Sequence, residues 1–318
     1  MKFVRFVHDG VSRWGAATEF GILDLTRAYA ARLAYAGEPE PYGLAEAVLP
    51  PEPKQFFARG DLALEQAADT LRQVQAAIGD GQTVSGPLGE KILFQPDEIQ
   101  WLPPVIPEKF LAIGLNYEDH VRETGKQIPE HPLLFSKLPS CIIGHGQAII
   151  LPVSSRRVDY EAELGVVIGR SAKRVSRTEA WDVVAGFTIV NDVTARDHQH
   201  LDGQWTRGKG LDTFGPLGPV IVTKDEIADP ANLPVRLWLN EQLMQDSNTR
   251  HLIFDIPTLI EYISQDITLS PGDVIATGTP PGVGVARKPP VYLQDGDVVT
   301  IEIEGIGRLI NPVKTLVR

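Results

Sequence analysis

The feature that most constrains the fold is a succession of short segments rich in Val and Ile after residue 108, separated by turn residues at short intervals. Each segment has the length and composition of a β-strand, and strands are predicted over 109–117, 161–170, 186–192, 218–223, 235–240, 273–279 and 297–305. Only two helices are expected among them, over 177–185 and 256–265, the second capped by Asp255. Because the strands outnumber the helices and do not alternate with them, the pattern disfavours a doubly wound parallel sheet and predicts a rolled or sandwiched β core.

The first hundred residues have a different pattern. Strands are predicted over 1–8 and 19–25, with Trp14 and Gly15 in the turn region between them. Helices are predicted over 26–36, where Thr26 is the cap, and over 61–78. The segment 37–53 between the helices is expected to be a loop. The Pro-rich segment 102–107 then indicates a boundary. We therefore expect an α+β, mostly β protein with a small mixed α/β N-terminal lobe (1–104) and a larger domain (105–318) that carries a mixed β-sheet core.

Composition excludes several classes of protein. The 318 residues carry a formal net charge of −11, which disfavours a nucleic-acid partner because such proteins need a clustered basic surface. The single cysteine, Cys141, cannot form an internal disulfide or a thiolate metal cage. No apolar run is long enough to cross a membrane, and the start MKFVRFVHDG lacks the apolar core of a secretory signal. A cytoplasmic protein without a membrane partner is expected.

Three carboxylates follow or precede apolar strands in the larger domain. Glu161 and Glu163 lie two residues apart on a predicted strand, so they project from the same face, and Asp192 ends the apolar strand GFTIVND. A solvated strand end explains the first pair equally well. Three carboxylates together instead form an oxygen-rich site, which predicts binding of Mg²⁺ or Mn²⁺.

Two further patterns are candidates for acid–base or anion chemistry. If the chain turns into a helix after 117, His120 and Glu123 become neighbours at i, i+3, an arrangement suited to a general base; the alternative is an incidental pair on an exposed helix. Lys209 lies in a glycine-rich segment that imitates a phosphate-binding loop, but Gly210 replaces the hydroxyl residue that this motif requires. Lys209 is therefore interpreted as a charge for an anionic substrate oxygen or as a solvated loop lysine. His198 and His200 are expected in a loop.

These segments together resemble the fumarylacetoacetate hydrolase family over roughly the last two-thirds of the chain. The resemblance rests on GLNYEDHVRE (114–123), PLLFSK (132–137), DYEAELGVVIG (159–169), NDVTARDHQ (191–199), GKGLDTFGPLGP (208–219), LNEQLMQDSNT (239–249) and PGDVIATGTPPGVG (271–284). Gly210 and Leu211 depart from the pair common after the lysine in that family. The resemblance also implies a homodimer.

The resemblance assigns expected roles to particular residues. It implies metal ligands at Glu161, Glu163 and Asp192, a water-activating dyad at His120 and Glu123, a charge-stabilising Lys209, and substrate contacts at Lys137, Arg196, Gln199, Gly278 and Thr279. The implied reaction is divalent-metal-dependent cleavage of a C–C bond in a 2,4-dioxo acid, an acylpyruvate or a 2,4-dioxo-3-deoxy sugar acid, to pyruvate and a carboxylic acid. The alternatives are oxaloacetate decarboxylation, isomerisation of the 2-hydroxymuconate type, and a catalytically silent metal-binding protein.

Overall fold

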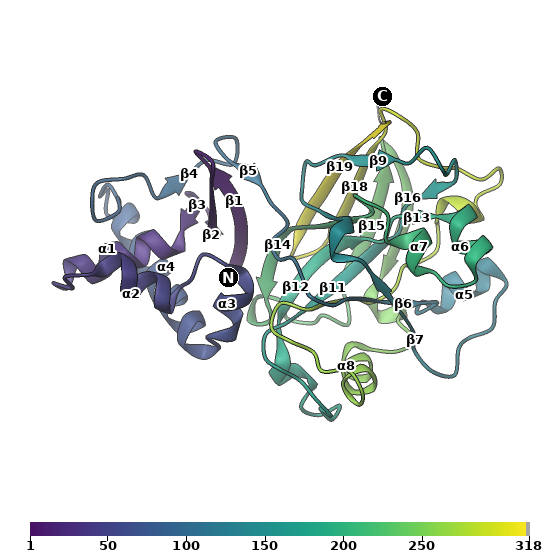
Figure 1. Cartoon of the computed structure of the whole chain (residues 1–318), viewed down its shortest axis with the longest axis horizontal. Coiled ribbons are helices and arrows are strands. Elements are labelled where there is room, and N and C mark those ends of the chain that lie inside the picture. Colours follow the sequence, from purple (N-terminus) through teal and green to yellow (C-terminus); the bar gives the residue numbers. More distant parts are fainter. Residues whose placement is uncertain (316–318) are drawn as a thin grey trace.

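The computed structural model describes residues 1–315 and divides visibly into a smaller N-terminal part and a larger body (Figure 1). The smaller part contains β1 (Lys2–His8), β2 (Val11–Thr18), β3 (Gly21–Asp24), α1 (Leu25–Tyr35), α2 (Pro41–Val48), α3 (Pro53–Ala58), α4 (Asp61–Gly79), β4 (Leu93–Phe94) and β5 (Gln100–Trp101). No helix within 1–315 is both long enough and apolar enough to cross a membrane.

The sequence interpretation of the N-terminal part was wrong at three places. Trp14 and Gly15 lie in the middle of β2, where they pair with β1, and the turn is made instead at Asp9 and Gly10, both with positive φ. Asp24 rather than Thr26 caps α1, because its carboxylate accepts the Arg27 N–H. The expected loop 37–53 contains α2 and the start of α3, whose first-turn prolines occupy positions that need no backbone donor.

The larger body contains most of the strands, as predicted. Its elements are β6 (Phe110–Gly114), α5 (Glu118–Thr124), β7 (Leu133–Lys137), β8 (Ile142–Ile143), β9 (Ile149–Leu151), β10 (Val158–Asp159), β11 (Ala162–Ile168), β12 (Val184–Asn191), β13 (Thr194–Ala195), α6 (Arg196–Asp202), α7 (Thr206–Lys209), β14 (Gly215–Thr223), β15 (Pro234–Leu239), β16 (Gln242–Asn248), α8 (Ile256–Ser264), β17 (Val274–Ala276), β18 (Val298–Ile303) and β19 (Gly307–Thr315).

Two helix predictions in this body need correction. The expected helix 177–185 is only a 3₁₀ turn, Ala180–Val183, because β12 already begins at Val184. The segment around His198 and His200, expected as a loop, forms α6, and Lys209 ends the short helix α7. The helix 256–265 is confirmed as α8, with the Asp255 side chain accepting the Thr258 N–H.

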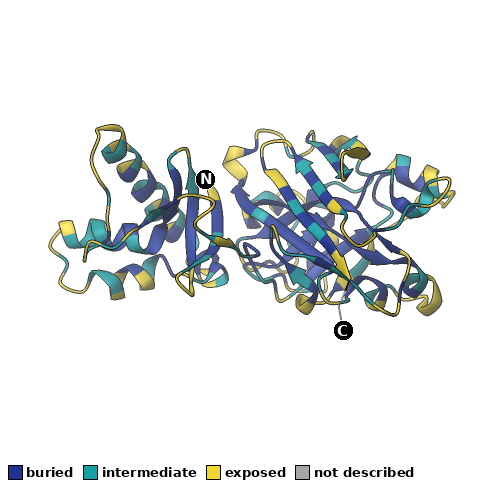
Figure 2. Cartoon of the chain, turned by 90° about the horizontal axis from the view of Figure 1, so that it is seen from above, coloured by how far each residue is buried: buried dark blue, intermediate teal, exposed yellow. Residues whose placement is uncertain are grey.

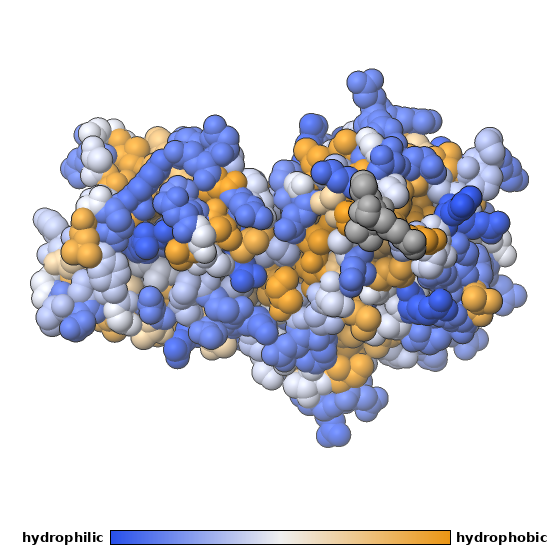
Figure 3. Space-filling model, turned by 45° about the horizontal axis from the view of Figure 1, so that its top comes forward, coloured by the Kyte–Doolittle hydropathy of each residue, from blue (hydrophilic) through white to orange (hydrophobic). Residues whose placement is uncertain are grey.

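The strands form two large sheets that confirm the mixed, strand-rich fold. One has the order β4-β3-β2-β1-β14-β12-β11-β17-β6-β7, and the other has the order β16-β15-β18-β19-β9. Their strands are mostly buried, whereas exposed residues gather on helices and loops (Figure 2). Hydrophilic residues cover most of the face in Figure 3. Because β1 pairs with β14, the first sheet runs through both parts of the chain, and the boundary at 104/105 stays a prediction.

Strand register places the three predicted metal ligands together. In the antiparallel pair of β11 and β12, Ala162 lies opposite Asn191 and Glu163 lies opposite Val190. The start of β11 and the end of β12 therefore lie side by side at the same end of these two strands, and the Asp192 N–H donates to the Glu161 carbonyl, 2.9 Å away.

Candidate active site

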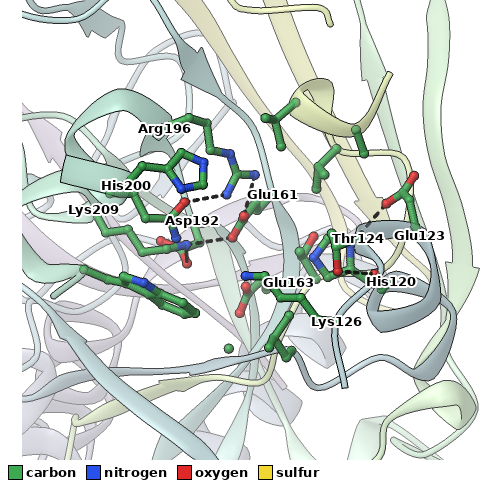
Figure 4. Close-up of a pocket in the computed structure, with 18 of the residues that line it drawn as sticks. His120, Glu123, Thr124, Lys126, Glu161, Glu163, Asp192, Arg196, His200 and Lys209 are labelled. Atoms are coloured by element: carbon green, nitrogen blue, oxygen red, sulfur yellow. Dashed lines mark hydrogen bonds and ion pairs between the residues drawn. The ribbon is translucent and has the colours of Figure 1, made fainter. Parts of the chain in front are cut away.

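The structure brings Glu161, Glu163 and Asp192 together where β11 begins and β12 ends, and one oxygen of each lies within 4.8 Å of the others. All three side chains are buried, with 5, 1 and 0% of their surface exposed. Figure 4 shows them projecting toward one region, with Arg196 and Lys209 on one side. Three buried carboxylates this close together could hold a divalent cation through their oxygens.

Three buried cations surround two of these carboxylates. The Lys209 ammonium contacts Asp192 and lies 2.8 Å from Glu161 Oε2, and the Arg196 guanidinium lies 2.7 Å from Glu161 Oε1. Lys137 Nζ donates to the other oxygen of Asp192 at 2.7 Å. The predicted substrate contact Lys137 is thus held behind Asp192, and it does not line the cavity.

Glu163 differs from its two neighbours because no cation among residues 1–315 forms an ion pair with it. One of its oxygens accepts the Gly278 N–H at 2.8 Å, which is where the structure places the predicted contact Gly278. Burial, followed by the charges of Asp192 and Glu161, raises the pKa of Glu163 well above its ordinary value. A buried carboxylate without a paired cation, beside two others, fits a bound divalent cation, which would supply the missing positive charge.

For Glu161 and Lys209, the attraction of neighbouring opposite charges outweighs the effect of burial on the pKa. Burial alone would raise the pKa of Glu161, but Lys209 and Arg196 outweigh it and hold that pKa far below its ordinary value. Burial would likewise lower the pKa of Lys209, yet Asp192 and Glu161 raise it. Lys209 is therefore a fully protonated cation at neutral pH, which suits it to bind an anionic oxygen.

His120 and Glu123 form the predicted pair on α5. His120 Nδ1 lies 3.2 Å from Glu123 Oε2, and Glu123 Oε1 accepts the Gly282 N–H at 2.9 Å. Both residues line the same cavity as the three carboxylates, on the opposite side in Figure 4. The carboxylate fixes the imidazole orientation, so His120 can present Nε2 as a proton acceptor or donor.

The cavity enclosed by these groups has a volume of about 520 Å³. Arg196, Gln199, Lys209 and Thr279 line it, and Thr279 Oγ1 accepts a hydrogen bond from the buried Gln245 side chain. Phe135 and Trp205 form an edge-to-face pair whose rings lie 4.9 and 6.0 Å from Lys209 Nζ. These two aromatic rings form an apolar wall of the cavity beside Lys209.

Sequence reasoning missed several contributors to this site, among them Asp159, Trp205 and Arg287. Asp159 binds Arg196, Trp205 forms part of the aromatic wall, and Arg287 lines the cavity. A signal existed for Asp159 alone, because it stands two residues before Glu161 in DYEAE. Trp205 and Arg287 lie in irregular segments whose position depends on long-range packing.

Comparisons with known proteins find similarity over most of the chain. Residues 109–314 match the family model described as fumarylacetoacetate (FAA) hydrolase C-terminal. The chain is 45% identical over 267 residues to oxaloacetate tautomerase Fahd2a, mitochondrial, of Rattus norvegicus, covering 83% of this chain and 80% of that protein.

Solved structures extend the likeness to the whole chain. Fumarylacetoacetate hydrolase from Exiguobacterium antarcticum aligns with a TM-score of 0.77 and 35% identity, over 99% of this chain and 100% of that one. Maleylpyruvate hydrolase from Sphingobium sp. SYK-6, solved in complex with manganese(II) ion and pyruvate, aligns with a TM-score of 0.71 and 30% identity over 99% of both chains. The N-terminal part of the fold is therefore shared with these neighbours.

Proposed function

Because the chain belongs to the fumarylacetoacetate hydrolase family, we propose that it is a metal-dependent enzyme that interconverts the enol and keto forms of a 2-oxo dicarboxylate of the oxaloacetate type. The observation that carries the proposal is one cavity that holds an acidic metal-site cluster together with the His120–Glu123 pair. A relative that is 45% identical and named oxaloacetate tautomerase supports this reaction over the C–C hydrolysis expected from the sequence.

Glu161, Glu163 and Asp192 would hold the cation, Mg²⁺ or Mn²⁺. When bound, it supplies Lewis-acid stabilisation of negative charge on the 2-oxo oxygen. The manganese(II) in the maleylpyruvate hydrolase structure supports the choice of metal.

The chain's own residues bind the substrate and move its proton. Arg196, with Gln199 hydrogen-bonded to it at 3.1 Å, would bind the carboxylate next to the 2-oxo group. His120 would transfer a proton to or from C3 with Glu123 holding its ring, while the oxygen on C2 loses or gains a proton, so that atoms and charge balance. The Lys209 ammonium would stabilise negative charge on that oxygen.

C–C hydrolysis of a 2,4-dioxo acid is the second candidate. Its supporting observation is the same His120–Glu123 pair, which could activate water in place of moving a C3 proton. The two similar hydrolase structures favour keeping it. Decarboxylation of oxaloacetate would need the triad and Lys209 but no attacking water.

A substrate comparison separates these reactions. Purified protein would be given the enol of oxaloacetate, and separately acetylpyruvate and fumarylpyruvate, with Mg²⁺ or Mn²⁺ and after chelation. Loss of enol absorbance without release of pyruvate would support the tautomerase. Pyruvate plus acetate from acetylpyruvate would support the hydrolase, and pyruvate plus CO₂ from oxaloacetate the decarboxylase. Absence of all three activities would refute the proposal.

We also propose the oligomeric state and the kind of partner of this enzyme. We expect a homodimer, which sedimentation velocity would detect, and a small keto acid rather than nucleic acid or membrane as the partner. The cytoplasmic location stays a prediction, and the rat relative is named as mitochondrial.

A further inference from the structure

The mouth of the cavity carries positive charges that are not paired with the carboxylates at its inner end. Lys126, Arg287 and Lys288 line it, and none of them forms an ion pair with a carboxylate in the described part of the chain. Inside the cavity, Arg196 and Lys209 are both paired with Glu161. An unpaired excess of cations at the mouth favours a ligand with a second negative group.

Arg287 is the best positioned of the three cations. It is half-buried, whereas Lys126 and Lys288 are exposed. Its Nε donates to the Gly282 carbonyl at 3.4 Å and its Nη2 to the Met244 carbonyl. Both acceptors are neutral, so they fix the guanidinium without cancelling its charge, and a fixed cation loses little entropy when it binds an anion.

The backbone also places Arg287 beside the proton-transfer pair. Gly282 accepts from Arg287 through its carbonyl and donates through its N–H to Glu123, so a single residue connects the guanidinium to the dyad. The turn that carries Arg287 is fixed in addition by Asp159, which accepts the Gly284 and Val285 N–H groups at 2.8 and 3.0 Å.

This position corresponds to a particular atom of the substrate. In a four-carbon 2-oxo dicarboxylate, the second carboxylate is bonded to C3, the carbon at which His120 would act. A cation that shares Gly282 with the dyad is therefore on the side from which it could contact that carboxylate when C3 faces His120.

We propose that Arg287 binds the second carboxylate of the substrate and so makes the site selective for 2-oxo dicarboxylates over 2-oxo acids with a neutral far end. This inference rests on the proposed function, because it assumes that the first carboxylate and the 2-oxo group occupy the inner end of the cavity.

The test compares oxaloacetate with its C4 methyl ester, which lacks the far negative charge and carries one added methyl group. For Arg287→Gln we expect kcat/KM for oxaloacetate to fall about tenfold or more, as for a lost charge-assisted hydrogen bond, with the ester changed less than about twofold. Arg287→Lys should recover part of the preference. Arg250→Gln, an exposed arginine that lies outside this cavity, controls for the loss of one positive charge.

Equal losses on both substrates would mean that Arg287 only supports its loop, and full activity of Arg287→Gln on both would mean that it does not contact the carboxylate. Either result overturns the proposal. Calorimetric binding of both compounds with Mg²⁺ present, on variants with wild-type unfolding temperatures, adds affinity as a second measurement beside the rate. A wild-type protein that prefers the dianion in binding but has no tautomerase activity would refute the proposed function alone; no preference in binding would refute the role of Arg287.

Discussion

The Asp159 carboxylate holds the Arg196 guanidinium in place: Nε donates to Asp159 Oδ2 at 2.8 Å, and Nη2 forms an ion pair with the same oxygen. Asp159 is fully buried and also accepts the N–H groups of Gly284 and Val285. One carboxylate therefore orients the predicted substrate-binding arginine and anchors the loop of the cavity mouth.

Asp159→Asn should weaken substrate use strongly. The amide removes the charge that pairs with a buried guanidinium, and breaking a buried pair costs about 3–5 kcal/mol when no other partner compensates. Because Glu161 still pairs with Arg196, we expect a smaller loss of stability, and a fall in kcat/KM of about tenfold carried mainly by KM. Steady-state kinetics and thermal unfolding measure both effects. Asp202→Asn, which disturbs an exposed pair with Arg207, should change neither; equal behaviour of the two variants would contradict this role.

His120→Ala and Glu123→Gln should separate catalysis from metal binding. General acid–base groups contribute about 10²–10⁴-fold to rates, so His120→Ala should lose at least about a hundredfold in kcat. Mn²⁺ affinity in a calorimetric titration should be unchanged, because neither residue belongs to the acidic triad. Glu118→Gln, on the same helix but exposed, is the control. Full activity of His120→Ala would rule out its role in proton transfer.

Lys209→Met should remove activity and make the fold depend on metal. The change leaves Glu161 and Asp192 buried with one cation fewer, and removing one partner of a buried ion pair destabilises by about 3–5 kcal/mol. A bound divalent cation compensates for this loss, so Mn²⁺ should raise the unfolding temperature of the variant more than that of the wild type. Thermal unfolding with and without Mn²⁺ tests this, with the exposed Lys173→Met as control. Equal shifts in both proteins would argue against a metal next to Lys209.

Metal binding should release a proton and strengthen as the pH rises. Burial, then Asp192 and Glu161, raises the pKa of Glu163 well above 4.5 in the metal-free protein. Between the pKa of Glu163 in the unfolded chain and its higher pKa in the folded protein, the folded state binds more protons than the unfolded state. The protonated Glu163 therefore contributes its full share to the free energy of unfolding below the unfolded pKa, and this contribution is lost as the pH rises through the folded pKa. A cation must displace that proton. Titrations of Mn²⁺ in buffers of different ionisation enthalpy should report the release, and Glu163→Gln should abolish it; an affinity independent of pH would contradict the assignment.

Gly114→Ala should distort the aromatic wall. A Cβ at this position would lie 2.4 Å from Cζ3 of the Trp205 ring, so the indole must move into the cavity or away from Lys209. We expect a KM raised several-fold and an altered tryptophan emission. Gly43→Ala, in α2, meets no atom within 4 Å and should be neutral or stabilise the helix by up to about 1 kcal/mol. If the two variants had the same kinetics, the wall would have no part in binding.

The sequence by itself determined the features that depend on local periodicity. Two-residue spacing predicted that Glu161, directly before β11, and Glu163, within it, would project the same way, and three-residue spacing placed His120 against Glu123 once α5 formed. Both follow from backbone geometry that every strand or helix shares. The run of strands likewise indicated a mixed β core.

The tertiary structure decided which side chain meets which across the chain. Asp159 contacts Arg196, 37 positions later, and Lys137 contacts Asp192, 55 positions later. Gly282 contacts both Arg287 and Glu123, and Glu123 lies 159 positions before Gly282. It also decided that Trp14 belongs to a strand and that α2 and α3 replace the expected loop, because β pairing and burial outweigh weak local preferences. Such contacts depend on register and loop closure, which residue spacing alone does not encode.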